Sequence, residues 1–252
     1  MTIQYCSDLH LEFPENKEYI LNNPIIPKAD ILILAGDIVP FNHLDKHDYF
    51  FDDVSKKFKE VYWIPGNHEY YLSDTQGRVG IFKKEIRTNV HLLNNHSIEI
   101  GNTKIILSTL WSKIPDDKMA IIEHSLNDFH IIKYNTDRFR ATMYNALFDE
   151  NFKFIQQEVK NNTKEKCLIV THHVPTFTNY PKQYLGSPIN NAFATDLDDF
   201  IIKNNIDAWI FGHNHANVLD FKVGETVLTT NQLGYVHARE HFDFDGTKVI
   251  EL

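Results

Sequence analysis

The sequence predicts an α/β fold in which two packed β-sheets are flanked by helices. Strand-like runs alternate with helical stretches, beginning with a βαβ pattern, and several later segments are rich in strand-forming residues. Asp30–Ala35 is a continuous apolar run after its first residue, which is typical of a strand covered on both faces. The length of 252 residues suits one large domain over residues 1–252.

Short runs of β-branched, aliphatic and aromatic residues between turn residues define the predicted strands. They are Thr2–Ser7, Asp30–Ala35, Glu60–Ile64, His91–Leu93, Ser97–Ile100, Lys104–Leu110, Lys166–Thr171 and Ala208–Phe211, followed by a β-meander from Val218 to Leu252. Apolar residues at helical spacing predict helices over Leu44–Phe58, Val79–Ile86 and Thr195–Lys203. The segment from Asp116 to Lys160 is predicted to be mostly helical and to form a cap, inserted at about residues 112–165.

Composition limits the kinds of partner. The formal net charge of −9 argues against broad electrostatic binding to nucleic acid or to an anionic membrane, and no apolar run reaches the length of a membrane span. A small phosphate ester stays compatible, because bound metal ions would set the field inside a site. The two cysteines, Cys6 and Cys167, lie inside predicted strands and are expected to be buried reduced thiols. A strand that starts at Thr2 leaves no room for a signal peptide, so we expect a cytoplasmic protein.

Potential metal ligands occur directly after the predicted strands. They are Asp8, His10, Asp37, Asn67, His172, His213 and His215. Because α/β folds place functional groups at the carboxyl ends of their strands, we expect these side chains to meet at one edge. Carboxylate, amide and imidazole ligands without a thiolate suit one or two divalent first-row ions such as Mn, Fe or Zn. Two adjacent ions suit displacement at phosphorus, since they hold the attacking and leaving oxygens together.

Two of these clusters have ordinary structural explanations when each is taken alone. Asp8 and His10 point to the same side of an extended segment, but an isolated Asp-x-His pair fits a surface turn better. Asp37 follows a glycine at the end of a buried strand, and it fits the N-cap of the next helix almost equally well.

The other clusters are harder to explain structurally. In the segment Gly66–Glu69 a turn needs glycine and tolerates asparagine, but it has no use for the histidine and glutamate that follow. One of the adjacent residues His172 and His173 fits a structural role, but two do so less easily. His213 and His215 follow a buried strand and present two imidazoles to one point. Together, the clusters predict a metal site.

In order and in residue type, the clusters resemble the five sequence blocks of the calcineurin-like metallophosphoesterase superfamily. The blocks are Asp8-x-His10, Gly36-Asp37, Gly66-Asn67-His68-Glu69, His172 and Gly212-His213-x-His215. Segments around Trp111, Asn127 and Gln232 are further similar to bacterial cytoplasmic members of unassigned substrate. The resemblance implies a four-layer αββα sandwich of two mixed sheets with helices outside.

The resemblance also implies a role for each residue of the blocks. Asp8, His10 and His215 would hold one metal ion, Asn67, His172 and His213 the other, and Asp37 would bridge both. We favour Mn as the metal, and Fe or Zn also suit the ligands. A hydroxide between the ions is the expected nucleophile, because metal coordination lowers the pKa of a bound water to about 7. His68 matches the acid that protonates the leaving oxygen, with a structural histidine as the alternative. Asp37 and His68 are therefore the predicted catalytic residues.

Four residues are predicted to contact the substrate. They are Asn67, His68, His173 and Trp111. We favour His172 over His173 as the ligand because His172 directly ends its strand, which leaves His173 to face the substrate. Trp111 is a candidate for stacking on a nucleoside-like group, with a core or cap contact as the alternative. Asn127 and Asp128 in the predicted cap are candidates for a pocket wall, or else solvated helix ends.

Differences between this sequence and two subfamilies limit the expected class of substrate. Ser/Thr protein phosphatases carry arginines after the second block and before the third, but no arginine stands near Asp37 or Gly66. Pro40 replaces the tyrosine of purple acid phosphatases, which favours divalent ions. Without a bidentate arginine, a phosphodiester of small or nucleotide type is the favoured substrate. A phosphomonoesterase or protein phosphatase, a nuclease and a non-catalytic interaction module are the alternatives. The acidic net charge weighs against the nuclease and the complete ligand set against the interaction module.

Overall fold

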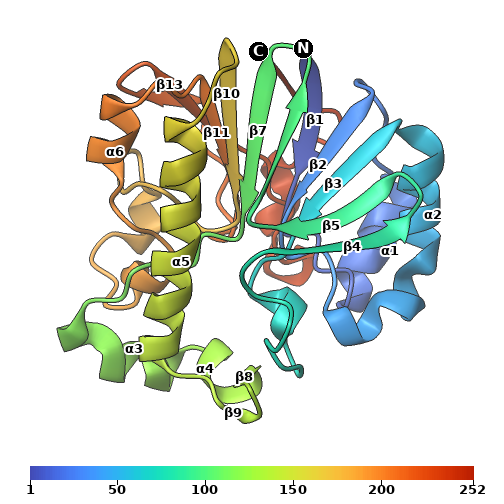
Figure 1. The fold of residues 1–252 in the computed structure, drawn as a ribbon. Helices are drawn as coiled ribbons and strands as arrows, with labels where there is room; N and C mark the ends of the chain where they lie inside the picture. Colours follow the sequence, from blue (N-terminus) through green and yellow to red (C-terminus); the bar gives the residue numbers. More distant parts are fainter.

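A computed structural model describes residues 1–252 and contains two six-stranded β-sheets that lie face to face (Figure 1). The first sheet has the order β14 (Val249–Glu251), β1 (Thr2–Cys6), β2 (Ile31–Ala35), β3 (Glu60–Ile64), β5 (Val90–Asn94) and β4 (Phe82–Arg87). The second has the order β12 (Phe221–Val223), β13 (Thr226–Thr230), β11 (Ala208–Phe211), β10 (Lys166–Thr171), β7 (Thr103–Ser108) and β6 (His96–Ile100). In both sheets the central strands are parallel and the edge strands are antiparallel.

Helices cover the outer faces of both sheets. Figure 1 shows α1 (Pro14–Asn22) and α2 (Asp48–Lys57) beside the first sheet, and α5 (Ala141–Lys160) and α6 (Asp198–Lys203) beside the second. The predicted αββα sandwich of two mixed sheets is therefore confirmed. Seven short 3-10 helices lie in the connections: η1 (Phe41–His47), η2 (His68–Tyr70), η3 (Asp116–Lys118), η4 (Lys182–Tyr184), η5 (Asn190–Ala192), η6 (Val236–Ala238) and η7 (Glu240–Asp243).

The continuous apolar runs arise because each central strand has one face toward the other sheet and one toward helices. In β2, Ile31 and Ile33 belong to the core between the two sheets. The alternate residues Leu32 and Leu34 belong to the larger core that includes the helices. All four side chains are at most 7% exposed, so neither face of this strand can be polar.

The segment predicted as a helix over Val79–Ile86 forms a strand instead. Most of it lies in β4, which pairs antiparallel with β5. Isolated helices of this length are marginal in water, whereas pairing with β5 gives the backbone groups hydrogen-bond partners. The apolar spacing that indicated a helix is explained by packing, because Val79, Phe82 and Ile86 contact the core cluster from its edge.

The predicted β-meander at the end of the chain is also wrong in part. β12 and β13 pair with each other in the second sheet, but β14 pairs antiparallel with β1 of the first sheet. This pairing covers the edge of β1, which would otherwise expose unpaired backbone groups. The N-terminal nitrogen of Met1 consequently lies 2.8 Å from the carbonyl oxygen of Leu252.

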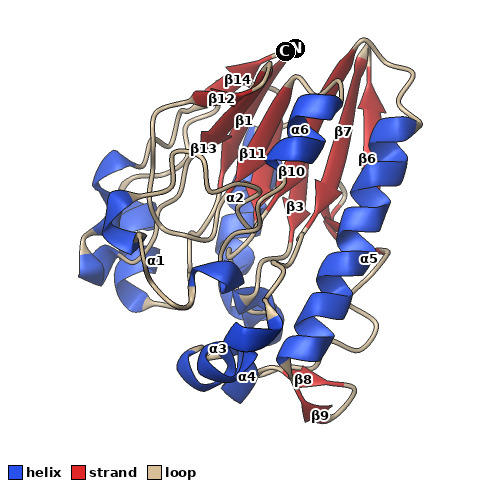
Figure 2. Cartoon of the chain, turned by 90° about the vertical axis from the view of Figure 1, so that its left-hand side faces the viewer, coloured by secondary structure: helices blue, strands red, loops and turns tan.

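The region predicted as a helical cap divides into two parts. Figure 2 shows α3 (Met119–Ser125), α4 (Asp128–Ile131) and the hairpin of β8 (Lys133–Tyr134) and β9 (Asp137–Arg138) at one end of the molecule. The long helix α5 instead runs along the second sheet, with Ile155 and Val159 in the core. The assignment of residues 1–252 to one domain stays a prediction.

None of the helices combines the length and the apolar character that crossing a bilayer requires. Cys6 and Cys167 are buried and unpaired, in agreement with the expectation of buried reduced thiols. The central parallel strands of both sheets end on the same side of the sandwich, and the residues that follow those ends build the site described next.

Candidate metal centre

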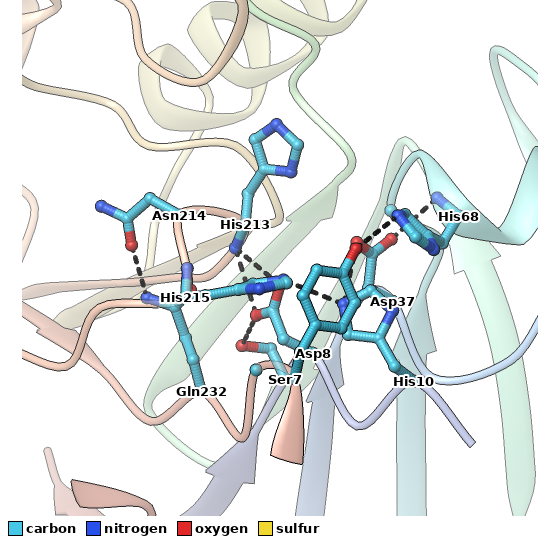
Figure 3. A network of polar contacts seen from close by, with 12 residues as sticks. Ser7, Asp8, His10, Asp37, His68, His213, Asn214, His215 and Gln232 are labelled. Carbon is cyan, nitrogen blue, oxygen red and sulfur yellow. Dashed lines mark hydrogen bonds and ion pairs between the residues drawn. The ribbon is translucent and has the colours of Figure 1, made fainter. Parts of the chain in front are cut away.

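The seven predicted ligands follow the ends of five parallel strands, and the structure brings them together between the sheets. Asp8 and His10 follow β1, Asp37 follows β2, Asn67 follows β3, His172 follows β10, and His213 and His215 follow β11. Donor atoms of Asp8, His10, Asp37 and His215 lie within 4.8 Å of one another, as do those of Asp37, His172 and His213. Asp37 belongs to both groups. Figure 3 shows Asp8, His10, Asp37 and His215 gathered around one point.

The tautomers of two histidines are set by carboxylates behind them. Nδ1 of His10 lies 3.3 Å from Oε1 of Glu12, and Nδ1 of His215 lies 2.8 Å from Oε2 of Glu240. A carboxylate only accepts, so each Nδ1 donates its hydrogen and the neutral ring keeps a lone pair at Nε2. The two Nε2 atoms face each other at 2.9 Å. Two lone pairs at this separation repel unless a cation or a proton lies with them, so this donor set fits a metal ion.

The second group is held in the same way. Nδ1 of His172 donates to the carbonyl oxygen of Ala35 at 2.9 Å, which leaves its Nε2 3.1 Å from Nδ1 of His213. The amide of Asn67 donates from Nδ2 to Oδ1 of Asp128 at 2.9 Å and turns its own Oδ1 toward His172 at 3.3 Å. Asp128 therefore fixes the orientation in which the amide offers its oxygen, the atom that a divalent ion prefers.

The backbone at the centre is held in a conformation that side chains rarely adopt. Five of the seven predicted ligands have positive φ angles: Asp8 (57°), His10 (45°), Asp37 (55°), His213 (77°) and His215 (50°). Each such residue costs on the order of 1 kcal/mol and persists only where the surroundings impose it. Such strain clusters at functional sites.

Two glycines of the sequence blocks give the ligands space. At Gly36, φ is +91°, and a Cβ there would collide with the ring of His172. At Gly66, a Cβ would collide with Oδ1 of Asp37 and lie 2.6 Å from Nε2 of His172. A side chain at Gly36 would therefore displace His172, and one at Gly66 would displace both Asp37 and His172.

Glu69, the last residue of the third block, joins the strand ends to each other. Its carboxylate is fully buried and accepts hydrogen bonds from the backbone N–H groups of Gly66 (2.6 Å), Asp37 (2.9 Å) and Ile38 (2.7 Å), and from Nε1 of Trp63 (3.2 Å). Burial and the neighbouring Asp37 carboxylate raise the pKa of Glu69 to about 8. The four donors favour the ionised form, because a carboxylate offers acceptors only.

In the metal-free protein, the predicted ligands themselves carry charge, as protonated histidines beside ionised carboxylates. Burial opposes protonation of His172, yet the Asp37 carboxylate raises its pKa to about 9. Burial likewise opposes protonation of His215, and Asp8 and Glu240 raise its pKa to about 10. The pKa values of Asp8 and Asp37 are lowered against the effect of burial by the neighbouring histidines. Protons on the imidazoles thus neutralise the buried carboxylates in the absence of a metal ion.

His68 lies beside the centre and is 7% exposed. Its Nδ1 is 3.0 Å from Oε1 of Glu12, its Nε2 is 3.3 Å from the hydroxyl of Tyr235, and its ring stacks on Tyr71 at 3.9 Å. Burial lowers the pKa of His68, but the carboxylates of Asp37 and Glu12 outweigh that effect and raise it. His10, Glu12 and His68 also form a third group of possible ligand atoms, in which both histidines use Nδ1 on the same carboxylate.

Trp111 and His173 lie behind the centre. Both are 1% exposed, and neither lines the cavity that opens onto Asn67 and His68. Trp111 packs edge-on against Tyr144, and the ring of His173 lies 4.1 Å from that of His213. Contact of either residue with a substrate stays a prediction.

Several supporting residues carried little or no signal in the sequence. Glu12 extends the first block as Asp-x-His-x-Glu, a spacing that could have indicated it. Asp128 was a candidate for a pocket wall, and the structure places it against Asn67 instead of a solvated helix end. Glu240 and Gln232 support His215 from the distant C-terminal region. The segment around Gln232 was noted only for its resemblance to other family members, and no local pattern indicated Glu240.

Comparisons with known proteins agree with the geometry. A sequence model of the calcineurin-like phosphoesterases matches residues 1–217. The chain is 34% identical over 268 residues to an uncharacterized protein of Acanthamoeba polyphaga mimivirus, covering 96% of this chain and 94% of the viral protein. The solved structure of a phosphopantetheinyl hydrolase from Mycobacterium tuberculosis matches with a TM-score of 0.75 and 17% identity, covering 99% of this chain and 95% of the hydrolase. At that identity the likeness concerns the fold alone.

Replacing Glu69 by glutamine should destabilise the protein. The amide has the same shape, but one of its ends donates, so at least one buried N–H group loses its acceptor at a cost of about 1–3 kcal/mol. Denaturant unfolding at a pH above about 8, where the Glu69 carboxylate is ionised, measures this loss. The control is Glu225→Gln, at a side chain that is 98% exposed, which should change stability little. Equal stabilities for the two variants would contradict the structural role of Glu69.

The metal-free protein should lose stability as pH rises above neutrality. The raised pKa values of His172 and His215 stabilise the folded state fully below about 6.5, and this contribution is lost as pH rises through about 9 and about 10. We expect a loss on the order of 2 kcal/mol, or a fall in Tm of roughly 5 °C. Thermal unfolding after chelation measures it. His215→Gln should flatten the dependence and His124→Gln, at an exposed position, should keep it; a Tm that stays level in the unmodified protein would refute the assignment.

Proposed function

The chain belongs to the calcineurin-like phosphoesterase family, and on this premise we propose that it hydrolyses phosphodiesters at a centre of two divalent metal ions. Family membership and the clusters of buried carboxylates and imidazoles support a metal-dependent phosphoesterase. The proposed ligands are Asp8, His10 and His215 for one ion, Asn67, His172 and His213 for the other, and Asp37 for both. Mn is the proposed metal.

The observation that carries the proposal is the pair of facing Nε2 atoms of His10 and His215, 2.9 Å apart, each backed by a carboxylate on its other nitrogen. Hydrogen bonding of this kind orients a metal-binding imidazole and makes its free nitrogen more basic. When bound, divalent ions lower the pKa of water to about 7 and draw charge from phosphoryl oxygens. The protein contributes a rigid, buried donor set that is already assembled.

His68 is the proposed general acid. Glu12 accepts the hydrogen of its Nδ1, so a second proton on the ring is carried at Nε2, the nitrogen that lies toward the Tyr235 hydroxyl. A raised pKa of His68 favours the protonated form that a general acid needs. His68 also lines the cavity beside the centre, where a leaving oxygen can reach it.

The charge of the cavity supports a diester over a monoester. Neither arginine nor lysine is among the residues that line the cavity at the centre. A phosphomonoester carries a second negative charge, and phosphatases commonly meet it with a bidentate guanidinium. A diester carries a single charge and needs no such partner.

A rate comparison tests the proposed function. The protein is stripped of metal, and Mn, Fe, Zn or Mg is added back in the presence of p-nitrophenyl phosphate or bis(p-nitrophenyl) phosphate. We expect no hydrolysis without metal, and a kcat/KM at least about tenfold higher for the diester with Mn, equal to about 1.4 kcal/mol of barrier. A higher kcat/KM for the monoester would make the protein a phosphomonoesterase, and no hydrolysis of either ester with any ion would reject the function.

His68→Ala should separate metal binding from proton transfer. The variant should keep its metal content, measured by elemental analysis, because the proposed ligands are intact. Turnover of a diester with a poor leaving group, such as a phenyl ester, should fall by about 10²–10⁴-fold, and turnover of the p-nitrophenyl ester should fall much less. Equal losses for the two esters would reject the acid role.

A further inference from the structure

A cavity of about 340 Å³ opens onto the metal centre. Its floor includes Asn67, His68 and His213, and its outer walls come from the connection between α3 and α4 and from the long connection between β10 and α6. Binding pockets for small molecules begin at about this volume. The cavity can therefore hold one substituent of a phosphate that lies at the centre.

One part of the wall is aromatic and aliphatic. Tyr180, Tyr184 and Phe193 line it from the β10–α6 connection, and Leu126 lines it from the α3–α4 connection. The ring of Phe193 stacks on that of His213, with centroids 4.8 Å apart and an angle of 25° between the planes. An apolar or flat substituent that leaves the centre along this wall meets ring faces and edges.

The charged groups of the cavity are all acidic apart from histidines. Asp37 lies at the floor, and Asp128 and Glu240 lie on the sides. The remaining polar groups of the wall are neutral, among them Asn127 and Ser187. A negatively charged substituent would leave water for a cavity that offers it carboxylates and, beyond the metal centre and His68, no cation.

From these walls, and resting on the proposed phosphodiesterase function, we propose a substrate class. The cavity binds an uncharged aromatic or amphipathic substituent of a diester and discriminates against a substituent that carries a second phosphate. Pyrophosphate-containing nucleotides and polynucleotides belong to the disfavoured class, because each places a further anion next to the scissile phosphate. Neutral amide and hydroxyl groups on the wall offer hydrogen bonds to polar atoms of the favoured class.

A matched pair of substrates tests the discrimination. The p-nitrophenyl ester of thymidine 5′-phosphate is compared with the same compound bearing a 3′-phosphate, so leaving group and nucleoside are identical. With the Mn-loaded protein, the added phosphate should lower kcat/KM by at least about tenfold, mainly through KM, a change equal to about 1.4 kcal/mol. An equal or higher kcat/KM for the 3′-phosphorylated ester would overturn the proposal.

A positive charge added to the wall should reduce the discrimination against the 3′-phosphorylated ester. Ser187→Lys places a cation at a position that lines the cavity and should reduce the difference in kcat/KM between the two esters. Gln183→Lys is the matched control, because it adds the same charge to an exposed position of the same connection that does not line the cavity. If Gln183→Lys reduces the difference in kcat/KM as much as Ser187→Lys does, the net charge of the protein alone explains the discrimination and the proposal fails.

The aromatic wall has a separate test. Tyr184→Ala should raise KM for bis(p-nitrophenyl) phosphate more than for methyl p-nitrophenyl phosphate, which has the same leaving group and lacks the second ring. Equal effects on the two substrates would remove Tyr184 from the proposed contact.

A binding measurement tests the proposed substrate class without relying on turnover. Calorimetric titration of the Mn-loaded protein with thymidine 5′-phosphate and thymidine 3′,5′-bisphosphate should give a Kd at least about tenfold higher for the bisphosphate. If no diester is hydrolysed but this difference holds, the proposed function fails and the substrate class of the cavity stands. If diesters are hydrolysed and the two Kd values are equal, only the substrate class fails.

Discussion

The structure depends on a buried concentration of lone pairs and negative charge at the meeting point of two sheets. Asp8, Asp37 and His172 are at most 1% exposed, and each has a donor atom within 4.8 Å of those of other potential ligands. Such a group is costly to bury without a compensating cation. Positive φ angles and the absence of side chains at Gly36 and Gly66 show how closely the surrounding backbone is adapted to hold it. The glutamate that joins the strand ends, Glu69, belongs to the same framework.

The sequence was sufficient for the parts of the fold that local patterns determine. A central strand such as β2 is apolar at each position because both of its faces are covered, and this pattern can be recognised without knowledge of its neighbours. The strand β4 was predicted as a helix, and the final strand β14 was predicted within a meander instead of beside β1, because edge strands are defined by their partners. The sequence of Phe82–Arg87 fits a short helix as well as a strand, and only pairing with β5 decides between them.

The same distinction between local patterns and distant partners applies to the candidate site. Ligand types and their positions after strands are local properties, so the convergence of residues such as Asp37 and His213 could be predicted from the amino-acid sequence alone. The groups that orient them are not local: Asp128 reaches Asn67 from 61 positions away, and Glu240 reaches His215 from 25 positions away. Trp111 was a candidate for substrate contact because an aromatic residue after a strand is ambiguous, and it lies in a buried aromatic cluster with Tyr144.

The spread of the proposed ligands along the chain has a consequence for how the protein matures. Small zinc domains gather their ligands within a few dozen residues, so the ion itself drives folding. Here the donors extend from Asp8 to His215, and the core between the sheets, which includes Ile33 and Val170, is built without any of them. We therefore expect acquisition of the proposed metal ions to follow folding, so that a cell short of the ion would accumulate a folded, empty protein that can be loaded later.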